Sequence, residues 1–326
     1  MTPAEILGAA MLGALVCYAL FAGADFGGGI WDLLASGPRA REQRALVERA
    51  IGPIWEANHV WLVLVVVVLF TGFPPAFAAI STRLFAPLTL LLVGVVLRGA
   101  AFTFRSYDTP RDEVQRRWGL LFSASSVLAP LMLGVAVGQI ASGSARALSL
   151  FPLLTGLFAA GLFAYLAATY LAVEAEGELR EDFRRRAIAA GAAVFALAAA
   201  AAAASAREAP LVFRGLTARG WSLPLHLATG AAAVVAFGAL FRRRFRLARL
   251  AAAVQVALIV VGWGASQYPW LVVPDLTFES ASAPRRTQVL LAWALGVGAL
   301  VLFPCLYLLF RVFKGEKPFS VMDRRP

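Results

Sequence analysis

Residues 6–24 read ILGAAMLGALVCYALFAGA and contain no charged side chain. A helix of this length crosses a hydrocarbon layer of about 30 Å, because each residue adds about 1.5 Å. Comparable apolar runs recur along the 326 residues, of which 60% are hydrophobic and 15% charged. Soluble domains carry about 25% charged residues. Because helices satisfy their own backbone polar groups in lipid, the sequence predicts an all-α integral membrane protein.

The apolar runs predict about nine transmembrane helices within one polytopic membrane domain that covers residues 1–326. Short loops containing Pro, Gly, Arg and acidic residues separate the runs. We expect two four-helix bundles and a peripheral ninth helix. The predicted helices are 5–34, 48–73, 76–105, 116–141, 150–175, 186–205, 222–241, 247–268 and 287–313.

Basic residues predict the orientation of these helices. Of the 30 Lys and Arg residues, 22 fall in one set of alternate loops, including the C-terminal tail, and 7 fall in the other set. Loops rich in Lys and Arg face the cytoplasm. We therefore expect an N-terminus outside and a C-terminus in the cytoplasm. The net charge of +11 is then explained by topology and anionic lipid, and nucleic acid is not an expected partner.

Metal-ligating residues are sparse in this sequence. Cys17 and Cys305 both lie within apolar runs, without the spacing of a metal site, and are expected to be core thiols. The two histidines, His59 and His226, are predicted at opposite membrane depths, which argues against a haem ligated by both. No metal site is therefore predicted in this chain.

Three charged side chains fall inside predicted helices, where a charge is costly and is usually functional. Asp25 lies toward the inner end of the first helix, Glu56 on the second and Arg98 on the third. Glu56 follows Arg49 by seven residues, or about 10 Å along a helix. In the predicted orientation, all three charges converge on the cytoplasmic third of the membrane.

Further polar residues extend this group. Glu56 and His59 share a helix face, and Trp55 and Asn58 share an adjacent one. Carboxylates and histidine can accept and release protons. We therefore predict a proton path through Asp25, Glu56, Asn58 and His59, supported by Trp55, Arg98 and Arg105.

A static ion pair is the alternative interpretation, in which Arg98 neutralises Asp25 or Glu56 and no proton moves. Arg98 and Arg105, seven residues apart, lie on one stripe of the third helix. Two acids, a histidine and an asparagine on one side of the membrane favour the proton path over the static pair.

Four motifs resemble subunit II of the cytochrome bd-type quinol oxidases, and they lie toward both ends of the chain. The first three are specific, whereas residues 120–260 are generic apolar sequence. The motifs are GADFGGGIWD at 23–32, IGPIWEANHVWL at 51–62 with FPPAF at 73–77, RGAAF with FR at 98–105, and YP with PDLT between 268 and 277.

The resemblance implies a respiratory subunit of the bacterial inner membrane with no catalysis of its own. The family's complex transfers electrons from quinol to oxygen. Subunit I, the partner in a heterodimer, is expected to hold the b- and d-type haems and the quinol site, and this chain is expected to ligate no cofactor. Some family members contain a structural quinone or a small accessory subunit. Subunit II is expected to scaffold subunit I and supply acidic residues to a proton path.

Matching the motifs assigns that path to Asp25 and Glu56, with Trp55, Asn58 and Arg98 around them. The family often has Asp in place of Glu56 and Gln in place of His59, so the details of the route differ here. A stand-alone secondary transporter or ion channel that uses Asp25, Glu56 and Arg98 is the rival hypothesis. A purely structural membrane subunit is a second rival.

Overall fold

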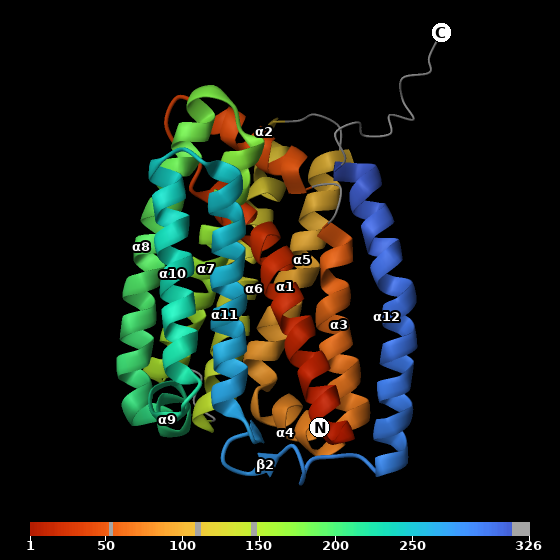
Figure 1. Cartoon of the computed structure of the whole chain (residues 1–326). Coiled ribbons are helices and arrows are strands. Elements are labelled where there is room, and N and C mark those ends of the chain that lie inside the picture. Colours follow the sequence, from red (N-terminus) through yellow and green to blue (C-terminus); the bar gives the residue numbers. More distant parts are fainter. Residues whose placement is uncertain (52–54, 108–111, 145–148, 315–326) are drawn as a thin grey trace.

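The computed structural model describes the backbone of residues 1–51, 55–107, 112–144 and 149–314. Side chains are described over these ranges except at 51, 55–57, 106–107, 112–113, 115, 309–310 and 312–314. Long helices lie side by side, and α1 is in the middle of the molecule (Figure 1). The helices are α1 Pro3–Leu33, α2 Ala40–Ile51, α3 Trp55–Gly72, α4 Pro74–Arg83, α5 Phe85–Tyr107, α6 Asp112–Ser142, α7 Leu150–Glu174, α8 Gly177–Glu208, α9 Pro210–Ala218, α10 Ser222–Phe241, α11 Phe245–Gln267 and α12 Arg285–Lys314.

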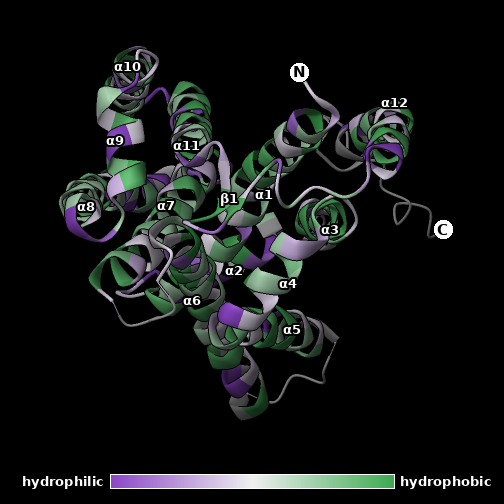
Figure 2. Cartoon of the chain, turned by 90° about the horizontal axis from the view of Figure 1, so that it is seen from below, coloured by the Kyte–Doolittle hydropathy of each residue, from purple (hydrophilic) through white to green (hydrophobic). Residues whose placement is uncertain are grey.

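The prediction of an all-α membrane protein is confirmed. Among the described residues, eight helices are long and apolar enough to span a membrane, or nine if α3 and α4 form one broken span. Hydrophobic residues cover the outward faces of these helices (Figure 2). The grouping into two four-helix bundles stays a prediction.

Helix α1 forms the core because its neighbours approach it very closely. It packs against α3, α6, α7 and α11. A Cβ atom at Gly27 would overlap the carbonyl oxygen of Phe163 on α7, and one at Gly29 would overlap the Ser126 hydroxyl on α6. The Trp31 indole also donates to the carbonyl of Ala164 at 2.7 Å. The glycine run after Asp25 therefore brings α6 and α7 against the segment of α1 that carries a charge.

The predicted helix 76–105 is wrong as a single element. The structure has two helices, α4 and α5, which are separated at Leu84. Pro74 and Pro75 begin α4, because proline is favoured in the first turn and disfavoured within a continuing helix. The axis of α4 turns by 119° from that of α3. The transmembrane segment that carries Arg98 therefore begins at Phe85.

Three other segments differ from the prediction. Residues expected in the loop 35–47 begin α2, an amphipathic helix at the end of the molecule opposite the N-terminus (Figure 1). The first residues of the predicted helix 48–73 also belong to α2, and α3 begins at Trp55. Helix α8 begins at Gly177 rather than 186, so its first turns are charged. The short helix α9 was not predicted. These segments are charged or short, so they lack the long apolar run on which the prediction depended.

The C-terminal helix α12 lies at the edge of the molecule opposite α8 (Figures 1 and 2). It packs mainly against α1 and α3, and none of its most apolar window is buried within the described chain. A small antiparallel sheet of β1 (Trp270–Val272) and β2 (Leu276–Thr277) precedes it, near α4 and the N-terminus.

Candidate functional site

A buried ion pair joins α1 to α5. The Arg98 Nη2 atom lies 2.6 Å from the Asp25 Oδ1 atom, and only 1% of the Arg98 side chain and 4% of the Asp25 side chain are exposed. The Arg98 Nε atom also donates to the Ser126 hydroxyl of α6 at 3.1 Å. The structure brings Asp25 to Arg98, whereas the side chain of Glu56, the other predicted partner, lies outside the described residues.

Aromatic rings and a helix irregularity complete the surroundings of Arg98. Its guanidinium carbon lies 4.8 Å from the centre of the Phe26 ring and 5.0 Å from that of Phe122, so the rings add cation–π attraction. Pro130 lies inside α6 and cannot donate a backbone hydrogen bond to the carbonyl of Ser126, four residues earlier. The backbone carbonyl of Ser126, whose hydroxyl binds Arg98, therefore receives no hydrogen bond from residue 130.

A second ion pair also joins α1 to α5, about two turns closer to the ends of these helices. The Arg105 Nη1 atom lies 3.2 Å from the Asp32 Oδ1 atom, and the Ser123 hydroxyl donates to Asp32 Oδ2 at 2.8 Å. Glu48 of α2 lies 3.6 Å from the other Arg105 nitrogen. Asp32 was missed as a site residue, although it follows Asp25 by seven residues, as Arg105 follows Arg98.

Unpaired polar atoms lie around the first pair. Within the described part of the chain, Asp25 Oδ2, the Tyr18 hydroxyl and His59 Nδ1 are buried without a partner in hydrogen-bonding geometry. The ring of His59 lies 6.2 Å from that of Tyr18 and 6.0 Å from that of Phe26. Buried polar atoms usually bind protein or ordered water. These three are therefore suited to binding water in the site.

Asp25 also lines an open cavity of about 670 Å³, which we call the inner cavity. Helices α1, α2, α3, α7 and α11 form its walls. Asn58 lies beside Asp25 at its deep end, whereas Glu174, Arg246 and Arg249 lie near the helix ends. Asp25 precedes the last residue of α1 by eight positions, or about 12 Å along the helix. The cavity thus connects the buried carboxylate to the end of the molecule where α2 lies.

The predicted roles of Trp55 and Glu56 fall outside the described side chains. Both residues lie in the first turn of α3. Trp55 precedes Asn58 by three residues, and Glu56 precedes His59 by three. The prediction for Glu56 therefore rests on its sequence position. Tyr18 and Ser126, by contrast, were not predicted, since a single tyrosine or serine in an apolar helix gives no sequence signal of its own.

An ion-pair network at the surface ties α2 to α8. Arg39, just before α2, donates two hydrogen bonds to Asp182, at 2.7 and 2.8 Å, and also pairs with Glu178. The hydrogen-bonded Asp182 carboxylate raises the pKa of Arg39 above its ordinary value. Gln43 donates to the same carboxylate and accepts from Arg186. The network fixes α2 over the ends of the spanning helices.

The histidines do not form a haem site together. His59 lies near the beginning of α3, packed between rings of α1, whereas His226 lies in the first turns of α10 and contacts the Ser222 carbonyl at 2.6 Å. These helices begin at opposite ends of the molecule (Figure 1). Among the described residues, no group of three or more His, Cys, Asp or Glu side chains could hold a metal ion.

The fold and this site define a polytopic membrane protein with a buried ionisable centre close to one end of its helices. The chain belongs to the cytochrome bd terminal oxidase subunit II family, whose model matches residues 4–313. It is therefore a subunit of an oxidoreductase complex that contains haem and a subunit I.

Individual relatives agree with this assignment. The putative cytochrome bd menaquinol oxidase subunit II of Bacillus subtilis is 24% identical, with 94% of each chain covered. Subunit 2 of the cytochrome bd-I ubiquinol oxidase of Escherichia coli K12 is 29% identical over 56% of this chain and 51% of its own length.

A solved bd oxidase structure from Geobacillus thermodenitrificans has the same fold. It matches with a TM-score of 0.81 and 22% identity, covering 96% of this chain and 99% of that chain. The family resemblance inferred from the motifs is therefore confirmed, and the rival hypothesis of a stand-alone transporter is not favoured.

Proposed function

We propose that this chain scaffolds subunit I of a respiratory quinol oxidase and carries protons from the cytoplasm toward the site of oxygen reduction. Asp25 is the central proton acceptor, and Glu56, Asn58 and His59 extend the path. Trp55, Arg98 and Arg105 support it. Residues 1–326 act as one membrane domain with no catalysis of their own.

The two oxygens of Asp25 are the observation that carries the proposal. One oxygen is held by Arg98 at 2.6 Å, and the other, on the cavity wall that Asn58 also lines, has no partner in hydrogen-bonding geometry within the described chain. That carboxylate lines the inner cavity. A buried acceptor without a hydrogen bond is unfavourable, so this oxygen requires water from the inner cavity. An oxygen facing a cavity can exchange protons with water.

The direction of the path follows from the basic residues. Helix α2 and the loop of Arg242, Arg243 and Arg244 lie at the end where α12 finishes (Figure 1). The inner cavity leads to the same end. We assign this end to the cytoplasm and the N-terminus to the outside, in accordance with the positive-inside rule.

We also assign the haems, b- and d-type, and quinol oxidation to subunit I. The two histidines of this chain lie apart and so do not form a pair of haem ligands. We also include a structural quinone and a small accessory subunit in the proposed complex, both outside the proton path.

The test is Asp25→Asn and Glu56→Gln, each expressed in the complete complex. Both substitutions keep the side-chain shape and remove the titratable group. We expect turnover with quinol and oxygen to fall by about tenfold or more for Asp25→Asn, since a positioned proton-transfer group contributes at least that much. The haem spectrum and the co-purified subunit I should be retained.

Glu5→Gln is a matched control, because Glu5 is a carboxylate of the same helix at the opposite end. It should leave turnover unchanged. Wild-type turnover in Asp25→Asn, with haem content intact, would refute the proton role. Family membership would be unaffected by that result.

A further inference from the structure

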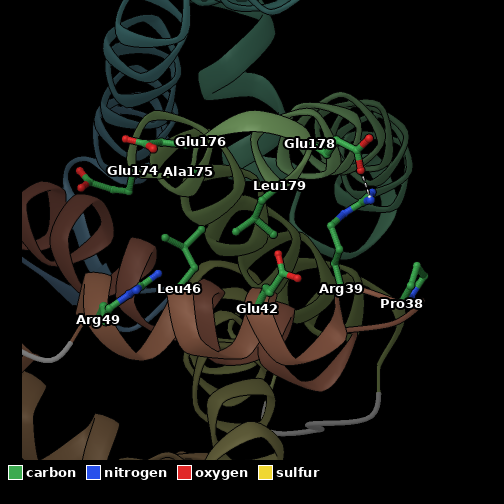
Figure 3. Close-up of a pocket in the computed structure, with 10 residues that line it drawn as sticks. All are labelled: Pro38, Arg39, Glu42, Leu46, Arg49, Glu174, Ala175, Glu176, Glu178 and Leu179. Carbon is green, nitrogen blue, oxygen red and sulfur yellow. Dashed lines mark hydrogen bonds and ion pairs between the residues drawn. The ribbon is translucent and has the colours of Figure 1, made fainter.

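Two hollows on the proposed cytoplasmic side share one wall. The first, the surface pocket, encloses about 730 Å³ between α2 and the α7–α8 connection. Glu174 lines both the surface pocket and the inner cavity, and the adjacent residues Arg49 and Ala50 each line one of them. In Figure 3, Glu174 lies with Glu176 and Arg49 at one end of the surface pocket. Glu174 thus stands at the junction of the two hollows.

Acidic side chains gather in the surface pocket. Glu42, Glu174, Glu176 and Glu178 line it from α2 and from the end of α7 onward (Figure 3). Carboxylates at a surface exchange protons rapidly with water, but a surface cluster alone does not define a route. The second observation is the buried Asp25 Oδ2 atom, which has no partner in hydrogen-bonding geometry within the described chain and belongs to a side chain that lines the hollow beyond Glu174.

The surroundings of Glu174 suit a carboxylate that contacts both the surface pocket and the inner cavity. One of its oxygens lies 3.6 Å from the Arg249 Nη1 atom, and 34% of its side chain is exposed. Arg249 in turn lies over the Tyr170 ring at 5.7 Å. Arg249 therefore orients Glu174 without enclosing it. The charged or titratable groups around Glu174 are Arg49 from α2, Arg246 and Arg249 from α11, and Tyr170 and Glu176 from its own segment.

The depth of the inner cavity along α1 and α7 suits a short file of water molecules. Asp25 lies about 12 Å below the end of α1, and α7 lines the same cavity from Leu166 to Glu174, again about 12 Å. Waters in a hydrogen-bonded chain are about 2.8 Å apart, so about four would cover this length. Thr169 lies on the cavity wall between the two ends and adds a hydroxyl.

We propose that Glu174 is the first proton acceptor of the path, where protons pass from the surface pocket into the inner cavity. This inference rests on the proposed function of Asp25. A proton from water in the surface pocket moves to a Glu174 carboxylate oxygen. Glu174 then releases it to water in the inner cavity, and the file delivers a proton to Asp25 Oδ2. No electron moves in these steps.

The test is Glu174→Gln in the complete oxidase, with oxygen consumption and proton uptake measured between pH 6 and pH 8. Glutamine keeps the size and polarity but cannot relay a proton as a carboxylate does. We expect turnover to fall about tenfold at pH 8 and about twofold at pH 6, where protons are abundant. Glu174→His should recover turnover, because imidazole also titrates near neutral pH.

Glu176→Gln is the matched control, because Glu176 lines the surface pocket only. It should stay within about twofold of wild type, since other carboxylates remain in that pocket. An equal loss in both variants would overturn the assignment and indicate a general effect of surface charge. If Glu174→Gln does not assemble, comparing Glu174→His with Glu174→Asn makes the same distinction.

The result for Asp25→Asn separates the two proposals. Normal turnover in Glu174→Gln with slow turnover in Asp25→Asn would refute Glu174 and leave the proton path standing. Normal turnover in both variants would refute the path itself.

Discussion

Replacing Arg98 by glutamine should destabilise the protein more than any other single change at the ion-pair site. The guanidinium binds Asp25 at 2.6 Å and Ser126 at 3.1 Å, so it joins α1, α5 and α6. Removing one partner of a buried ion pair costs about 3–5 kcal/mol. At about 2–4 °C per kcal/mol, the thermal midpoint should fall by about 10 °C.

The double variant Asp25→Asn/Arg98→Gln tests the cause of that loss. It leaves no uncompensated charge, so it should be more stable than Arg98→Gln by at least about 1 kcal/mol. The assay is thermal unfolding of the detergent-solubilised complex, followed by size-exclusion chromatography and the haem spectrum. Additive losses from the two substitutions would refute the reasoning, because they would show no energetic coupling between the two side chains.

Two further predictions concern packing. Gly27→Val should abolish assembly with subunit I, because its Cβ would overlap a backbone carbonyl of α7, whereas Gly13→Val, which has open space, should assemble normally; co-purification of subunit I measures both. Ala253→Leu fills part of the inner cavity and should slow proton uptake while haem content is retained. Uptake at the wild-type rate in Ala253→Leu would show that protons do not use this cavity.

Much of the architecture could be predicted from hydrophobicity alone. Long apolar runs determine the spanning helices, because lipid leaves the backbone few alternatives. The break between α4 and α5 escaped this reasoning, since the polar residues Ser81, Thr82 and Arg83 are flanked by apolar residues on both sides and hydropathy does not detect a change of direction. Pro74 and Pro75 were the available signal, and they mark where α4 begins.

The site was predictable in its charges but not in its pairing. Asp25 and Arg98 stand out because charges are rare in apolar helices. Sequence spacing could not decide between Asp25 and Glu56 as partners of Arg98, since the choice depends on how α5 and α6 rotate against α1. Ser126 and Tyr18 were not found, because only the packed structure brings their hydroxyl groups to the site.

The proposed role of Glu174 could not be predicted from the sequence, for a different reason. It lies at the end of α7, where a glutamate would ordinarily be interpreted as a solvated terminus. Its position between two hollows depends on α2 and α11, which are far away in sequence. The proposed role therefore required the three-dimensional arrangement.

The ion pair can form only after both of its residues have been synthesised. Seventy-three residues separate Asp25 from Arg98. At about 5–20 residues per second, the ribosome needs about 4–15 seconds to supply the partner after Asp25 has been made. We infer that α1 waits beside the translocation channel during this interval, and crosslinking of chains arrested before α5 would detect it there. Asp25 then enters the bilayer interior only when α5 arrives with the neutralising charge.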